Sequence, residues 1–386
     1  MGYTVLYVIA ILSLGLFAKN NRTLNLILAI TLYLLFAFER SDQDYLNYLQ
    51  SYDLVGSGSI SEMLRVEPSY FLFCTLGNKY GLTFDAARAI VCVFEVLAIF
   101  TTIRVFSTQI ACILALFLIF PATADAELFR WLGAMSVVIY ALPYLIRGES
   151  KRDFLMYSFL VVLATSLHTS CIFFLFYNII YINDKKLILF IVIAFSTVLL
   201  VFSQTSILYK ILSYLPIQES LNEKFQETGM SNIFGVIALA FREFFIFFIA
   251  YVTGRKYNTN TGSLSFVDGK FSLKRRKYSQ QQMCLLLCDK LWNINIVSLS
   301  LIAVSLYTPQ VQRLFHVLLF VNTIAAIYVS LKLHNKKVKL ITIACVVITL
   351  ILHISNGPNN IAIFMSHFNE GFLVNFIDVV FYNKPF

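Results

Sequence analysis

The chain has 386 residues, of which 59% are hydrophobic and only 13% are charged. A soluble fold of this size needs a polar surface that this composition does not provide, so a soluble enzyme, a disordered tail and a nucleic-acid reader with a basic surface are all excluded. The formal net charge of +9 comes mostly from basic residues in short connectors between apolar runs, which is typical of an integral membrane protein.

Apolar runs follow one another along the chain and predict an all-α polytopic membrane protein. A membrane-spanning helix needs about 20 apolar residues. The run 154–182 is too long for one crossing and carries a polar spot at 166–170, so we predict two short crossings that meet at His168. The other candidate crossings are 2–18, 24–38, 84–105, 108–120, 130–146, 187–203, 232–253, 286–307, 314–331 and 338–354. Together they predict a single transmembrane domain, 1–386, with about twelve crossings, some of them short or broken.

Basic connectors predict the orientation of the chain. Under this count, five of them lie on the same side: 19–22, 147–153, 183–186, 254–282 and 332–339. The positive-inside rule makes that side cytoplasmic. We therefore predict a multi-pass protein of the bacterial cytoplasmic membrane, with a basic cytoplasmic loop at 254–282 and both termini outside.

The predicted outer side includes segments that are longer than simple turns, among them 39–83, 204–231 and 355–386. The segment 39–83 is acidic, and in it Pro68 occupies a favourable first helical position before an apolar stripe that includes Tyr70. We predict an outer loop with a short interfacial helix there, and an outer C-terminal tail at 355–386. The seven cysteines lie in or beside apolar runs without framework spacing, so we expect neither a disulfide nor a metal site.

Charged residues at membrane depth are costly and mark function by default. Glu95, Arg242 and Glu243 lie within predicted crossings, and several arginines lie at outer ends: Arg40, Arg65, Arg88, Arg130 and Arg313. Each arginine alone is equally well explained by snorkelling to headgroups, and Arg242–Glu243 by a structural contact. Their recurrence on the outer side, where basic residues are disfavoured, points instead to an anionic ligand. The guanidinium fork matches phosphate oxygens in pairs, so a lipid diphosphate fits this pattern.

Several short motifs resemble those of one known family, the EpsG-like branch of the Wzy exopolysaccharide and O-antigen polymerases. The motifs are an acidic residue followed by tyrosines at 44–52, Glu67-Pro68-Ser69-Tyr70, Arg130 at the start of a crossing, the histidine element at 164–170, and a late arginine, Arg313. They cover most of residues 39–183 and are sparse afterwards. Ser69 stands where the family often has glycine, and Trp131-Leu132-Gly133 replaces a more usual Gln-x-Ala.

The resemblance implies a membrane glycosyltransferase that joins oligosaccharide repeat units carried on undecaprenyl diphosphate. The growing chain would pass from its lipid to an incoming unit at the outer face of the membrane. The expected partners are the lipid-linked donor and acceptor, the bilayer and a chain-length regulator, with no nucleic acid, cofactor, nucleotide or metal. Asp42-Gln43-Asp44 resembles the metal-binding acidic pair of soluble glycosyltransferases, but nucleotide sugars are absent outside the cell, so we reject a metal role.

The expected site residues form two groups. Binding of the diphosphate and the substrate is assigned to Arg130, Arg313, Arg242, Arg40, Arg65, Tyr48 and Tyr70. Removal of the proton from the acceptor hydroxyl is assigned to Glu67, Asp44 or His168, which the sequence does not rank. A flippase for the same lipid-linked sugars is the main alternative, although we find no internal repeat of the kind transporters often have. A membrane O-acyltransferase is third, without a matching motif.

Overall fold

The computed structural model describes residues 2–40, 43–56, 66–148, 150–182, 184–203, 244–253, 278–305, 312–355 and 375–376. All elements in these ranges are helical, as predicted. The chain divides into two compact units, one formed by Met1–Met63, Pro68–Tyr140 and Ile343–Phe386 and the other by Leu64–Glu67 and Ala141–Thr342. Helices α9 (Phe129–Arg147) and α18 (Lys336–Ser355) contribute residues to both units.

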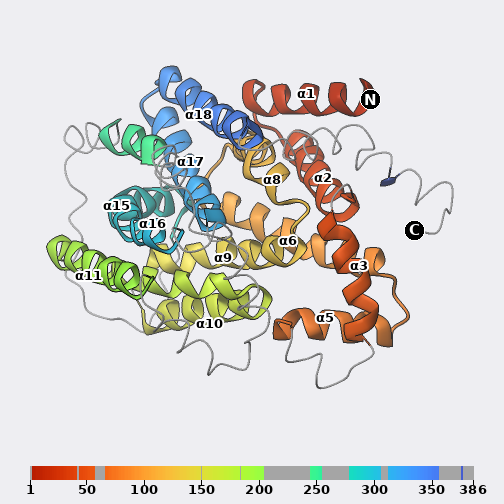
Figure 1. Cartoon of the computed structure of the whole chain (residues 1–386). Helices are drawn as coiled ribbons and strands as arrows, with labels where there is room; N and C mark the ends of the chain where they lie inside the picture. The colour runs from red at the N-terminus through yellow and green to blue at the C-terminus, as the bar shows by residue number, and fades with distance from the viewer. Residues whose placement is uncertain are drawn as a thin grey trace. The chain divides into compact units, whose positions relative to one another are not determined.

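The first unit begins with α1 (Gly2–Phe17) and α2 (Arg22–Phe38), followed by α3 (Gln43–Gly56) and α5 (Pro68–Lys79). It continues with α6 (Phe84–Phe106), α7 (Ile110–Phe117), the kinked segment η1 (Leu118–Ala122) and α8 (Thr123–Asp125). Helix α2 packs against α6 and α7, and α3 lies beside α5 (Figure 1). These contacts gather the end of α2 and the starts of α3 and α6 in one region.

Local sequence signals explain where these helices begin. The Asn21 side chain accepts a hydrogen bond from the Leu24 N–H before α2, and the Thr83 side chain accepts one from the Ala86 N–H before α6. Both caps satisfy donors that a helix start leaves unpaired. Gly77 in α5 faces the Tyr52 hydroxyl so closely that a Cβ would collide with it. Glycine therefore permits the close packing of α3 and α5.

The second unit contains α10 (Lys151–Leu167), the 3₁₀ helix η2 (Thr169–Tyr181), α11 (Lys185–Ser203) and a helix at Phe244–Thr253. Helices α15 (Gln280–Ser298), α16 (Ser300–Ser305) and α17 (Leu314–Lys332) follow. The predicted break in the run 154–182 is present, because His168 is extended and separates α10 from η2. The two segments pack on each other, and the Tyr157 hydroxyl donates to the Phe174 carbonyl at 2.7 Å.

The predicted number of crossings is not confirmed. Among the described residues, four helical stretches are long and apolar enough to cross a membrane: Phe84–Phe106, Phe129–Arg147, Gln280–Ala303 and Leu314–Lys332. Five other apolar helices have 10–17 residues. Most of the loop 254–282 and of the tail 355–386 lies outside the described residues, as does the first part of the predicted crossing 232–253.

The structure differs from the prediction at one helix boundary and by one additional helix. Helix α15 begins at Gln280, inside the predicted loop, because Ser279 and Gln282 form a reciprocal capping box. The segment 39–83 contains a second helix, α3, as well as the predicted α5. In α3, Tyr45, Tyr52 and Val55 are buried at a spacing of about 3.6 residues per turn, a helical pattern within a stretch that is too polar to read as a crossing.

A reciprocal amide pair joins α15 and α17 and provides a test of the second unit. Asn295 Nδ2 donates to Asn322 Oδ1 at 2.9 Å, and Asn322 Nδ2 donates back at 3.0 Å. Both side chains are almost fully buried, so replacing one removes both hydrogen bonds of this pair from the other buried amide, at a cost of about 1–3 kcal/mol. We expect Asn295→Leu and Asn322→Leu to lower the melting temperature in detergent, and the double variant to lose less than the sum.

The control is Gln281→Leu, an exposed position near the start of α15, which should melt like the wild type. Strictly additive losses in the double variant would show that the two amides do not stabilise each other.

Candidate functional site

The candidate site lies in the first unit, where α2 and α3 meet the starts of α6 and α9. It contains a buried charged cluster at Asp85 and a guanidinium, that of Arg130, held against aromatic rings. Helix ends carry nearly all of these groups, so their positions depend on how the helices begin and end.

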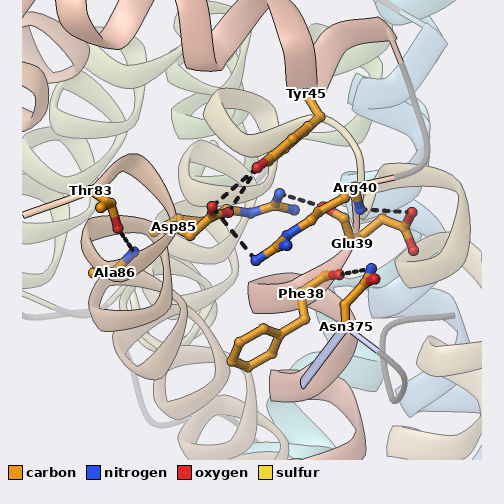
Figure 2. Close-up of polar contacts among 9 residues, drawn as sticks. Phe38, Glu39, Arg40, Tyr45, Thr83, Asp85, Ala86 and Asn375 are labelled. Atoms are coloured by element: carbon orange, nitrogen blue, oxygen red, sulfur yellow. Dashed lines mark hydrogen bonds and ion pairs between the residues drawn. The ribbon is translucent and has the colours of Figure 1, made fainter. Parts of the chain in front are cut away.

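Asp85, in the first turn of α6, is the centre of the charged cluster. Its carboxylate is 3.6 Å from Arg40 Nη2 and accepts hydrogen bonds from the Tyr45 hydroxyl at 3.1 and 3.2 Å. Figure 2 shows the Arg40 and Tyr45 side chains converging on this carboxylate from the segments around α2 and α3. The Asp85 side chain is only 3% exposed and that of Arg40 is 20% exposed. The buried negative charge is thus balanced by an arginine that keeps some contact with solvent.

Arg88, one turn further along α6, holds two backbone carbonyls. Its Nη1 donates to the Glu39 carbonyl at 2.6 Å, and its Nη2 donates to the Ala126 carbonyl at 2.9 Å. The residue is 1% exposed, so it does not snorkel to headgroups, which was one interpretation of the outer-end arginines. Glu39 also accepts a hydrogen bond from the Arg40 N–H through Oε1, at 3.1 Å (Figure 2).

Arg130, the second residue of α9, lies over the faces of two tyrosines. Its guanidinium carbon is 5.5 Å from the centroid of the Tyr48 ring and 5.3 Å from that of Tyr70. Both distances are within the range of cation–π attraction. The Tyr70 hydroxyl shares a hydrogen bond of 2.7 Å with Ser51 Oγ. The two rings, one from α3 and one from α5, therefore fix the direction in which Arg130 points.

An aromatic cluster connects Arg130 with the charged cluster. Phe84, directly before Asp85, has its ring centroid 5.9 Å from that of Tyr45, 6.4 Å from Tyr48 and 5.8 Å from Phe129. Phe129 in turn precedes Arg130. The cluster consists of Tyr45, Tyr48, Tyr52, Tyr70, Phe73, Phe84 and Phe129.

Tyr45 and Tyr70 have raised pKa values. Burial, together with the neighbouring Asp85 charge, raises the pKa of Tyr45 to about 12, and burial also raises that of Tyr70. Both phenols stay protonated at physiological pH, so they act as hydrogen-bond donors and not as bases. Because the folded pKa of Tyr45 exceeds its unfolded value, its contribution to stability is complete below about pH 10 and is lost as the pH rises towards about 12.

The other predicted residues are spread along the chain. Asp44 is half-buried in the first turn of α3, one turn before Tyr48. Glu67 directly precedes α5 and belongs to the second unit. In that unit, His168 Nδ1 lies 2.8 Å from Ser170 Oγ, and Arg313 is the half-buried N-cap residue of α17. Four further residues lie outside the described part of the chain: Asp42, Arg65, Arg242 and Glu243.

Asp85 is a site residue that was not predicted from the sequence. An acidic residue in the first turn of a helix is ordinary, because it interacts favourably with the helix dipole, so Asp85 gave no distinct signal. Within the described ranges, no three His, Cys, Asp or Glu side chains lie close enough together to hold a metal ion.

The apolar helices and the buried charges at their ends define this chain as a membrane protein with a polar site built from helix termini. Its family follows from comparison with family models, in which the EpsG family matches residues 22–367. The chain therefore belongs to the EpsG family, which connects it with polysaccharide biosynthesis and confirms the resemblance seen in its motifs. Comparison with curated proteins gives no match, and comparison with solved structures gives none either.

The contact between Arg130 and Tyr70 can be tested through stability. Tyr70→Phe keeps the ring and loses the hydrogen bond to Ser51, which is worth about 1 kcal/mol. Tyr70→Leu also loses the cation–π contact, worth about 0.5–2 kcal/mol. We therefore expect the melting temperature to fall from wild type to Tyr70→Phe to Tyr70→Leu.

In an Arg130→Met background, the difference in melting temperature between the two Tyr70 variants should be smaller. An unchanged difference would mean that the contact between Arg130 and the Tyr70 ring does not stabilise the protein. Tyr80→Leu is the matched control, because Tyr80 is 72% exposed and its replacement should leave the melting temperature unchanged.

Proposed function

We propose that this protein is a polysaccharide polymerase that joins oligosaccharide repeat units carried on undecaprenyl diphosphate at the outer face of the cytoplasmic membrane. Membership of the EpsG family supports the reaction class. The observation that carries the proposal is the position of the Arg130 guanidinium, which lies against the rings of Tyr48 and Tyr70. A fixed guanidinium is suited to the charge that builds up on a departing diphosphate.

In the proposed reaction, a hydroxyl of the acceptor sugar attacks the anomeric carbon of the donor chain. A new glycosidic C–O bond forms, and the bond to the diphosphate breaks, with its electron pair leaving on the diphosphate oxygen. That leaving group needs little protonation, but its charge must be stabilised. Arg130 takes this role, and Arg40 is the second candidate because its guanidinium is partly exposed beside Asp85.

The hydroxyl proton needs an acceptor. Asp44 is our first candidate, because it precedes Tyr48 by one turn and so lies on the same side of α3. Glu67 and His168 remain candidates, as do Arg313, Arg65 and Arg242 for the diphosphate. Tyr70 is only 2% exposed, so its ring supports Arg130, whereas half-buried Tyr48 is the better ring to stack on a sugar. A chain-length regulator is the proposed protein partner.

The diphosphate role is tested by Arg130→Lys, which keeps the charge and removes the guanidinium fork. We expect a loss of about a hundredfold or more in polymerisation rate, measured as polymer length on gels after complementation of a deletion strain. Arg104→Lys, an exposed position in the last turn of α6, should restore full-length polymer.

The deletion strain itself separates the alternatives. Loss of a polymerase leaves single repeats displayed outside, loss of a flippase leaves them trapped inside, and loss of an acyltransferase leaves chain length intact. Long polymer in the deletion strain, or a fully active Arg130→Lys variant, would contradict the proposal.

The proton acceptor is tested by Asp44→Asn, Glu67→Gln and His168→Gln in purified protein with lipid-linked repeats. We expect Asp44→Asn to lower kcat by about 10²–10⁴-fold with a much smaller change in KM. A larger kcat loss in either of the other variants would transfer the role to that residue.

A further inference from the structure

We infer that Asp85 and Arg88 are positioning residues that set the spacing between Arg40 and Arg130, the two arginines of the first unit assigned to the diphosphate. The inference rests on the proposed function and identifies residues that give its site a fixed geometry. Neither side chain is suited to bind the diphosphate itself. Asp85 carries a negative charge, and Arg88 is 1% exposed with both terminal nitrogens donating to carbonyls.

Asp85 acts on Arg40. Its buried carboxylate is 3.6 Å from Nη2 of Arg40 and also accepts hydrogen bonds from the Tyr45 hydroxyl. An arginine that follows the end of a helix has many accessible rotamers, and a buried counter-charge restricts them. Figure 2 shows how the Arg40 side chain extends towards Asp85. The partly exposed guanidinium is thereby presented in one direction.

Arg88 acts on the backbone before both arginines. The Glu39 carbonyl is in the residue that precedes Arg40, and the Ala126 carbonyl lies just before the start of α9. A short turn leads from Ala126 to Arg130, and it is closed by hydrogen bonds from the Leu128 N–H to the Asp125 carbonyl at 3.0 Å and from the Leu132 N–H to the Leu128 carbonyl at 2.8 Å. A single guanidinium thus ties two segments that are far apart in the sequence.

The first two turns of α6 therefore contact both halves of the proposed diphosphate site. Phe84 adds ring contacts to Tyr48, which lies under Arg130, and to Phe129, which precedes it. Because two phosphate groups must meet two guanidinium groups at once, a change in spacing weakens binding of a diphosphate more than that of a monophosphate. This difference separates positioning from a general loss of structure, which would weaken both ligands alike.

The experiment measures binding of farnesyl diphosphate and farnesyl monophosphate to the full-length protein in nanodiscs. We expect Asp85→Asn and Arg88→Lys each to weaken diphosphate binding by about tenfold or more and to leave monophosphate binding nearly unchanged. Lysine at position 88 has one ammonium and cannot reproduce the fork that spans two carbonyls. Asp53→Asn, which removes an exposed carboxylate from α3, is the control and should match the wild type.

Double variants show through which arginine each residue acts. In an Arg40→Lys background, Asp85→Asn should cause little further loss, and Arg88→Lys should cause little further loss in an Arg130→Lys background. Tyr45→Phe removes only the hydroxyl that holds Asp85, so it provides a milder variant if Asp85→Asn melts early. Like Asp85→Asn, Tyr45→Phe should weaken binding of the diphosphate more than binding of the monophosphate.

Each outcome bears on a specific statement. A wild type that does not bind the diphosphate overturns the proposed function, and this inference with it. A wild type that binds, combined with variants that keep its preference for diphosphate or lose both ligands equally, overturns the inference alone. Fully additive losses in the double variants also overturn it, because they would show that Asp85 and Arg88 act independently of Arg40 and Arg130.

Discussion

The buried carboxylate of Asp85 is the constraint on which the described part of the site depends. A charge removed from water must be paired and hydrogen-bonded, and removal of one partner from such a pair typically costs about 3–5 kcal/mol. Arg40 and Tyr45 meet this need from segments on either side of the α2–α3 connection. The start of α6 thereby ties the end of α2 to the start of α3.

Arg40, Arg88 and Arg130, three of the arginines of the first unit, show how burial separates residues of one type. Arg88 is enclosed and donates to two backbone carbonyls, Arg40 pairs with a carboxylate while partly exposed, and Arg130 lies against two tyrosine rings. The sequence places all three at outer ends of apolar runs and does not distinguish them. Only the structure separates Arg88, which binds two backbone carbonyls, from Arg40 and Arg130, for which we propose an anionic ligand.

Most helix positions could be predicted, because hydropathy and helix breaks are local properties of the chain. The crossing predicted at 84–105 corresponds to Phe84–Phe106, and the one at 314–331 corresponds to Leu314–Lys332. The polar spot at His168 also coincides with a real break between α10 and η2. The prediction failed at α3, whose buried tyrosines alternate with polar residues, and at the start of α15, where a capping box extends the helix into a polar stretch.

The sequence by itself determined that this is a helical membrane protein of the EpsG type with an unusual set of arginines, because composition and short motifs carry that information. The tertiary structure alone decided which charges meet. Asp85 lies far along the chain from Arg40 and Tyr45, and Arg130 lies further still from Tyr48 and Tyr70. Such pairings arise from the packing of whole helices. The hydrophobic pattern of one segment does not specify which distant residues the ends of that segment will contact.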